Sequence, residues 1–267
     1  MKARRKKRSK PPRVGIWLDL DWGLKREMDV YAGFQSYADG AGWVCSIDPA
    51  IEDSLASGSK EIPYDGVLAR VTPGIAEVAG KSGTPLVNVW LNSPVKEVPS
   101  VLADHEASGA MAAEHLLGRG FREFGYLGFL RLEDIRRQLR GFRGVLKREG
   151  FRCSAHRFPH RQIAVSAPGW RKFVKGLHEW VDTWKPPIGI LVCDDLYCRF
   201  LIDVCRSKGL SIPGELAIVG SENETIMCES PAPSLTSIDM GHAQQGYRAA
   251  ALLERLMDGE APPVEPD

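Results

Sequence analysis

The sequence has little of what marks several large classes of protein. Its 267 residues carry 35 basic and 34 acidic side chains, so it lacks the bulk positive charge that attracts nucleic acid. It has no apolar run longer than a strand, and its basic start at 1–13 lacks the apolar core of a secretory signal. We therefore expect neither a membrane span nor export. The six cysteines form no C-x-x-C pair, which indicates reduced, buried thiols in a cytoplasmic protein.

Signatures of catalysis are missing as well. The chain contains no G-x-S-x-G elbow, P-loop, H-E-x-x-H or G-x-G-x-x-G motif, and its histidines have no Cys or Ser partner at an informative spacing. We expect no enzyme, no cofactor and no metal site. One enzymatic alternative stays open, because paired carboxylates serve glycosidases as well as sugar-binding proteins.

What the chain does have is a repeated alternation of strand and helix patterns. In the most informative stretch, 188–223, an apolar run ends at Asp194 and Asp195, a helical pattern follows, and a second apolar run ends at Glu222 and Asn223. This is the pattern of a βαβ unit. In an open parallel sheet the ends of such strands are where ligands bind, so the stretch indicates a pocket as well as a fold.

The same alternation covers most of the chain. Strands are expected at 14–18, 43–47, 65–69, 85–90, 101–103 and 124–128, and helices at 28–38, 75–80, 108–119, 135–149, 170–184 and 246–258. The pattern predicts an α/β fold with parallel sheets and right-handed crossovers.

Four motifs occur in a fixed order along this pattern. They are a D-x-x-x-x-G-x-x-A-x-x-H-L-x-x-x-G segment at 104–120, the polar pair Asp194-Asp195, a G-L-S-I-P-G-E-L-A-I-V-G-S-E segment at 209–222 and P-S-L-T-S-I at 233–238. Together they resemble the sensor domains of lactose-repressor type (LacI/GalR) regulators. The subgroup that the chain most resembles is the xylose-operon regulators (XylR), which carry an AraC-type DNA-binding domain after the sensor.

The resemblance implies a periplasmic-binding-protein-like type I architecture of two Rossmann-like lobes around a hinged ligand cleft. It implies an N-terminal lobe at 13–120 plus 238–259 and a C-terminal lobe at 121–237, with a disordered basic arm at 1–12 and a tail at 260–267. Too few residues precede Val14 for a DNA-binding module, so we expect this module after Asp267, beyond the end of a fragment.

The function that the resemblance implies is ligand sensing in a transcriptional regulator of sugar catabolism. A monosaccharide, by resemblance a pentose and specifically xylose, would bind between the lobes of a homodimer, and lobe closure would act on operator DNA through the separate domain. The alternative is a stand-alone sugar-binding protein without a DNA-binding role.

Polar side chains at the strand ends fit a sugar by their chemistry. Carboxylates accept hydrogen bonds from vicinal hydroxyls, arginine donates in a fork, and aromatic rings cover the apolar faces of a sugar. The first half of the chain places Asp19, Asp21, Trp22, Arg70, Trp90 and Asp104 after its expected strands. Two alternatives stay open: Asp104 and Asp195 could cap the helices that follow them, and Trp22 and Trp90 could pack in the core.

The basic helix expected at 135–149 offers a further candidate. The resembled family has a ligand-contacting arginine three residues before a Gly-aromatic pair, and the matching position before Gly141-Phe142 is Gln138. Arg137 is one residue out of register. Either residue is a candidate ligand contact, and a solvated basic face is the alternative.

Overall fold

The computed structural model describes residues 10–20, 25–56, 63–159, 167–230, 232–263 and 265–267. The chain divides into two compact units. Unit 1 contains the described residues up to Ala103 together with Gly241–Asp267, and unit 2 contains Asp104–Met240. Most of the predicted basic arm, and the predicted site residues Asp21 and Trp22, lie outside the described residues.

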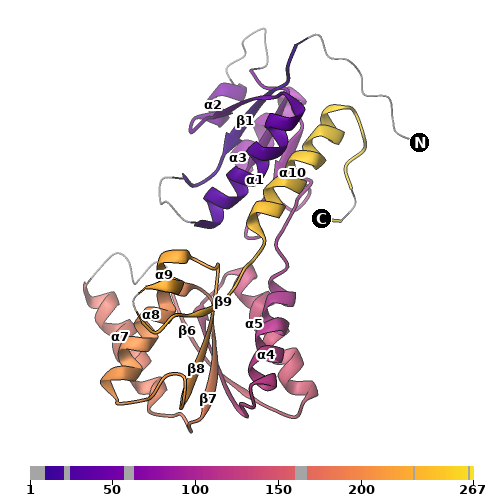
Figure 1. The fold of residues 1–267 in the computed structure, drawn as a ribbon. Helices are drawn as coiled ribbons and strands as arrows, with labels where there is room; N and C mark the ends of the chain where they lie inside the picture. The colour runs from indigo at the N-terminus through magenta and orange to yellow at the C-terminus, as the bar shows by residue number, and fades with distance from the viewer. Residues whose placement is uncertain (1–9, 21–24, 57–62, 160–166, 231, 264) are drawn as a thin grey trace. The chain divides into compact units, whose positions relative to one another are not determined.

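Unit 1 is built on a parallel sheet with strand order β2-β1-β3-β4. Its strands are β1 (Arg13–Trp17), β2 (Val44–Ile47), β3 (Gly66–Ala69) and β4 (Leu86–Asn88). Its helices are α1 (Lys25–Ala41), α2 (Ile51–Ala56), α3 (Pro73–Ser82) and α10 (His242–Met257). Figure 1 shows α10 alongside α1, although 200 residues, 42–241, lie between them in the sequence.

The period-two pattern of the strands explains the two faces of this sheet. Every residue of β3 is buried. Leu68 packs in the core formed with α1 and α10, whereas Val67 and Ala69 pack in a second core formed with α2 and α3. Successive side chains of a strand point to opposite faces, so one apolar strand serves both helical layers.

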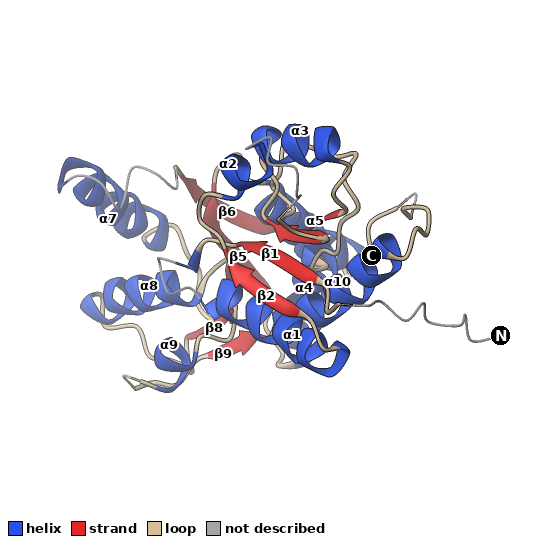
Figure 2. Cartoon of the chain, turned by 90° about the horizontal axis from the view of Figure 1, so that it is seen from above, coloured by secondary structure: helices blue, strands red, loops and turns tan. Residues whose placement is uncertain are grey.

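Unit 2 has a parallel sheet with strand order β6-β5-β7-β8-β9. Its strands are β5 (Glu123–Phe129), β6 (Cys153–Phe158), β7 (Ile188–Val192), β8 (Leu216–Ser221) and β9 (Thr236–Ile238). Its helices are α4 (His105–Gly118), α5 (Glu133–Arg148), α7 (Ala167–Val181), α8 (Asp195–Ser207) and α9 (Thr225–Glu229). In Figure 2 α7 and α8 lie next to each other, and they are in contact.

Close helix pairs explain where the chain passes from one unit to the other. A Cβ atom added to Gly109 on α4 would overlap the carbonyl oxygen of Gln138 on α5, and one added to Gly141 on α5 would overlap that of Glu106. The α4 helix is therefore tied to α5 and belongs to unit 2. The chain enters this unit at Asp104, earlier than the boundary expected at residue 120.

Both sheets repeat one topology, and this repeat positions the candidate site. In each sheet the first strand lies second from one edge, the second strand forms that edge, and the remaining strands lie on the other side. The winding direction therefore reverses between β1 and β3 in unit 1, and between β5 and β7 in unit 2. In open α/β sheets ligands bind outside the carboxyl ends of the strands at such a switch point.

The predicted α/β class with parallel sheets is confirmed. The sequence patterns missed α2, β6, α9 and β9, and the strand expected at 101–103 is reduced to a single bridge between Asn88 and Ser100. Cys193, Cys198, Cys205 and Cys228 are buried thiols as predicted, whereas Cys45 and Cys153 are partly exposed. Among the described residues, no helix is both long and apolar enough to span a bilayer.

Candidate functional site

Three sequence-predicted residues meet at the switch point of unit 1. Asp19 follows β1, Arg70 follows β3 and Trp90 follows β4. The Nη1 atom of Arg70 donates to Oδ2 of Asp19 at 3.1 Å, and the guanidinium carbon lies 4.9 Å from the centre of the Trp90 ring. An arginine held by a carboxylate and stacked on an indole is fixed in direction, which is what recognition of a small polar ligand requires.

A buried amide fixes the backbone around this group. The side chain of Asn88 is 2% exposed, and its Oδ1 accepts from the backbone N–H of Trp90 at 3.0 Å and of Val71 at 3.2 Å. Its Nδ2 donates to Oγ of Ser100 at 3.0 Å. One side chain thereby joins the segments that follow β3 and β4, the two segments that carry Arg70 and Trp90.

Sequence reasoning missed a second carboxylate at this point. Glu27 in the first turn of α1 is buried, and its Oε1 lies 3.3 Å from Nη1 of Arg70. Burial raises the pKa of Glu27 above its ordinary value, against the lowering effect of Arg70 and Arg26. An acidic residue in the first turn of a helix is common, so the sequence carried no signal that would single it out.

In unit 2 two predicted carboxylates cap helices. The Oδ1 atom of Asp194, directly after β7, accepts from the backbone N–H of Leu196 at the start of α8 at 2.9 Å. Asp104 accepts from Ala107 at the start of α4, also at 2.9 Å. Asp104 therefore caps α4, which was the alternative to ligand binding for this residue. Asp194 caps α8 and also lies at the switch point of unit 2.

Asp195 has a role inside unit 2. It is 1% exposed, and its oxygens accept from Oγ of Ser237 at 2.7 Å and from the backbone N–H of Glu224 at 2.8 Å. Burial raises its pKa, although these hydrogen bonds oppose the effect. Asp195 therefore ties α8 to β9 and to the segment before α9, a contact between residues far apart in the sequence.

Strained backbone conformations occur at the carboxyl edge of the unit 2 sheet. Among the described residues the non-glycine positions with positive φ are Arg131 at 66°, Glu222 at 96° and Asn223 at 50°, and all three follow strands of unit 2 at their carboxyl ends. The backbone N–H of Glu222 donates to Ile238 at 3.1 Å and that of Asn223 to Oγ of Ser237 at 3.0 Å, which holds the turn in place. Such conformations cost free energy and are found at ligand sites.

On α5 the two candidate residues have different surroundings. Gln138 is 2% exposed; it accepts from the Tyr126 hydroxyl at 2.9 Å and donates to Oγ of Ser221 at 2.8 Å. Arg137 is partly exposed, and its Nε donates to Glu133 at 2.9 Å. Gln138 thus connects α5 to β5 and β8. Arg137 instead forms an ion pair with Glu133 on its own helix.

Three carboxylates of unit 2 influence the pKa of one buried thiol. Burial raises the pKa of Cys193 at the end of β7, and the charges of Asp194, Asp134 and Glu222 raise it further. Asp134, in the first turn of α5, was not predicted from the sequence; it is 7% exposed. Within the described part of the chain no three His, Cys, Asp or Glu side chains form a group able to hold a metal ion.

Known proteins share sequence with more than half of the chain. Residues 113–266 match the periplasmic binding protein-like domain. The xylose operon regulatory protein of Escherichia coli (strain K12) is 26% identical over 213 residues, which cover 75% of this chain and 52% of that protein. The chain spans about half the length of the curated relatives it matches.

Solved structures share the fold. The structure of a xylose-binding transcription activator superposes with a TM-score of 0.74 at 22% identity, covering 96% of this chain and 66% of that one. A LacI family transcriptional regulator from Enterococcus faecium with bound ribose gives a TM-score of 0.73 at 19% identity, with coverage of 95% and 92%. At these identities the likeness concerns the fold, in agreement with the two parallel sheets.

Proposed function

The chain belongs to the periplasmic binding protein-like domain family, and on this premise we propose that it is the sugar-sensing part of a transcriptional regulator. The observation that carries the proposal is the group at the switch point of unit 1, where Asp19, Arg70 and Trp90 meet. It combines a hydroxyl acceptor, a forked donor and an aromatic face, the three elements that a monosaccharide needs.

Unit 2 contributes the acceptors in this proposal. Asp194 and Glu222 follow β7 and β8 at their carboxyl ends, Asp134 lies in the first turn of α5, and Asn223 follows Glu222 in the chain. Carboxylates accept hydrogen bonds from the hydroxyl groups of a sugar. We propose that the chain binds one monosaccharide through such residues and that binding changes the conformation of the chain.

Xylose is the sugar that the relatives favour, because a xylose operon regulatory protein and a xylose-binding activator are among them. Identity near one quarter does not fix stereochemistry, which depends on the placement of individual side chains. We therefore propose a pentose as the ligand, and xylose is the first pentose to test. Operator DNA would be bound by a module outside these residues, in a homodimer located in the cytoplasm.

The test is a thermal-shift panel of pentoses and hexoses on the purified chain. A ligand at one hundred times its Kd stabilises a protein by about 2.7 kcal/mol, which raises the melting temperature of a chain of this size by roughly 5–10 °C. We expect this shift with D-xylose or another pentose. The absence of a shift with every sugar in the panel would contradict the proposed function.

Two further measurements separate the alternatives. Two helix-turn-helix motifs encoded downstream of Asp267 would support the regulator, whereas a stop codon there would leave the stand-alone sugar-binding protein. Chemical conversion of the bound sugar during prolonged incubation would indicate an enzyme instead. Sedimentation equilibrium with and without sugar tests the expected homodimer.

A further inference from the structure

We propose that Glu27 is a positioning residue for Arg70, and that the two carboxylates on this arginine direct its remaining N–H groups toward an uncharged pair of neighbouring hydroxyls. The inference rests on the proposed function, since it concerns the same ligand site. It adds a residue that contacts no ligand, and it specifies the charge of the group that Arg70 recognises.

The surroundings of Arg70 set the direction of its guanidinium. Its Nη1 atom lies 3.1 Å from Asp19 and 3.3 Å from Glu27, and the Trp90 ring covers one face at 4.9 Å. The Nε and Nη2 atoms have no hydrogen-bond partner among the described residues. These two atoms form the side of the guanidinium that donates two parallel hydrogen bonds.

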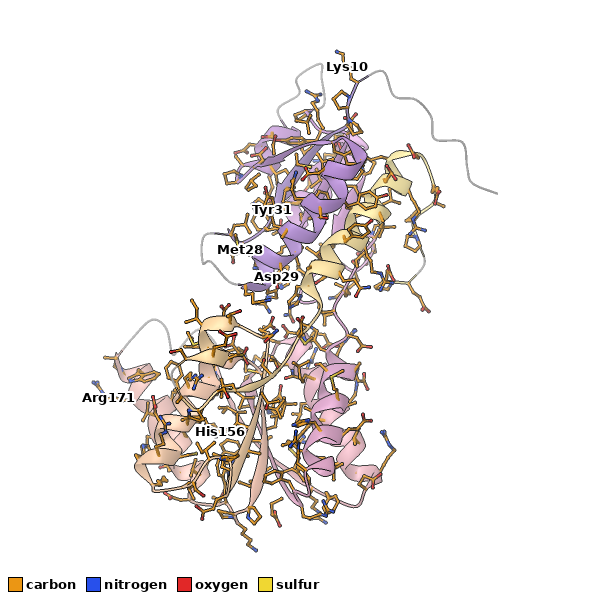
Figure 3. All side chains as sticks on the ribbon, in the orientation of Figure 1. Lys10, Met28, Asp29, Tyr31, His156 and Arg171 are labelled. Atoms are coloured by element: carbon orange, nitrogen blue, oxygen red, sulfur yellow. The ribbon has the colours of Figure 1, made fainter. Side chains whose placement is uncertain are left out.

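The two carboxylates hold Arg70 from different elements. Asp19 follows β1 and is 39% exposed at its side chain, whereas Glu27 belongs to α1 and is 6% exposed there. The start of α1 can be followed in Figure 3 by the labelled Met28, Asp29 and Tyr31, directly after Glu27. The contact with Asp19 is a hydrogen bond, whereas Glu27 contributes a buried ion pair, which solvent screens less.

The charges of this group balance. Glu27 also lies 3.6 Å from Nε of Arg26, so two carboxylates and two arginines share the group. Their formal charges cancel. A sugar acid or a phosphorylated sugar would therefore gain little net attraction and would lie close to Asp19 and Glu27, whereas an uncharged diol needs only the two parallel donors.

The ionisation of Glu27 separates a positioning role from a structural one. Burial raises the pKa of Glu27 above its ordinary value of 4.5. The folded chain therefore favours the protonated form more than the unfolded chain does, and ionisation of Glu27 near neutral pH lowers stability. A group that costs stability in its charged form and yet holds an arginine in place fits a role in binding.

The experiment compares wild type with Glu27→Gln, using D-xylose, or the pentose with the largest thermal shift if xylose gives none. Calorimetry should show binding weakened by about ten- to a hundredfold, as expected when the buried ion pair that orients a ligand-binding arginine is lost. The melting temperature without sugar should stay the same or rise. Glu77→Gln, which removes a surface partner of Lys81 on α3, is the matched control. It should change neither the affinity for sugar nor the melting temperature.

A pH series supplies the second readout. The groups that face Glu27 are Arg70, Arg26, Asp19 and His242. As the pH falls from neutrality toward the raised pKa of Glu27, wild-type affinity should fall. Glu27→Gln retains the other four groups, so the difference between the two profiles belongs to Glu27.

The outcomes distinguish this inference from the proposed function. A wild type that binds no sugar contradicts both. If wild type binds but Glu27→Gln binds equally well, or loses melting temperature together with affinity, the positioning role is wrong. If D-xylonate or D-xylose 5-phosphate binds wild type more tightly than D-xylose does, the charge argument is wrong.

Discussion

Glu222 combines a strained backbone with a position at the proposed site. Its φ of 96° lies in a region that favours glycine, and the backbone strain of such a residue costs about 1–3 kcal/mol. The surrounding hydrogen bonds to Ile238 and Ser237 keep the turn in this conformation. Strain of this kind at a strand end is typical of ligand sites, so Glu222 is a position at which binding and folding can be tested separately.

Two substitutions at this position separate strain from binding. Glu222→Gly should raise the free energy of unfolding by about 1 kcal/mol, since relief of strain exceeds the entropy cost of glycine. Glu222→Ala keeps the strain and should give no such gain. Both remove the carboxylate and should weaken sugar binding by on the order of 1–3 kcal/mol, measured by calorimetry. Unchanged affinity in both variants would remove Glu222 from the site.

Part of the site could be predicted at this scale, and part could not. Asp19, Arg70 and Trp90 were predictable because parallel strands bring their carboxyl ends to one edge of a sheet. Asp195 also follows an expected strand. Its partners Ser237 and Glu224 are distant in the chain, so the sequence could not predict its buried contacts.

At the scale of elements, the packing of α4 on α5 depends on glycine. A Cβ atom at Gly141 would overlap the carbonyl oxygen of Glu106, whereas one at Gly144, three residues later on the same helix, would lie 3.9 Å from Arg148. Gly141→Ala should therefore force the helices apart and lower the free energy of unfolding by at least about 2 kcal/mol. Gly144→Ala should raise it by up to about 1 kcal/mol.

Urea unfolding of the two variants provides the measurement. Because both replace glycine by alanine on α5, their difference reports helix contact and not helix propensity. Equal stability of the two would show that α4 and α5 tolerate a wider separation. Close glycine packing would then no longer explain why α4 belongs to unit 2.

The two strands that the sequence missed, β6 and β9, share a physical cause. In β6 only Phe158 is buried, and the three-residue β9 has only Ile238 buried, so neither carries an apolar run. Both are held by backbone hydrogen bonds to neighbouring strands. In the stretch expected as a strand at 101–103, Val101 donates its backbone N–H to the carbonyl oxygen of Asn88, but the pairing there is a single bridge, too short for a strand.

At the scale of the whole molecule, the two units differ in how the chain builds them. Unit 2 is one continuous stretch, 104–240, with its own sheet and a core on both faces. Unit 1 needs its last helix: Ala249, Ala250, Leu252 and Leu253 of α10 are buried in the core that β1 and α1 share. A fragment that ends at residue 103 would expose this core to water.

This difference predicts the behaviour of fragments. Residues 104–240 should fold alone, with cooperative thermal unfolding and a native near-ultraviolet circular dichroism spectrum. Residues 1–103 should not, because loss of α10 uncovers the apolar surface of α1 and β3. Joining 103 to 241 with a flexible Gly/Ser linker should restore folding, since closing a longer loop costs little. A fragment 1–103 that unfolds cooperatively on its own would show that α10 is dispensable, and the dependence of unit 1 on its returning helix would be wrong.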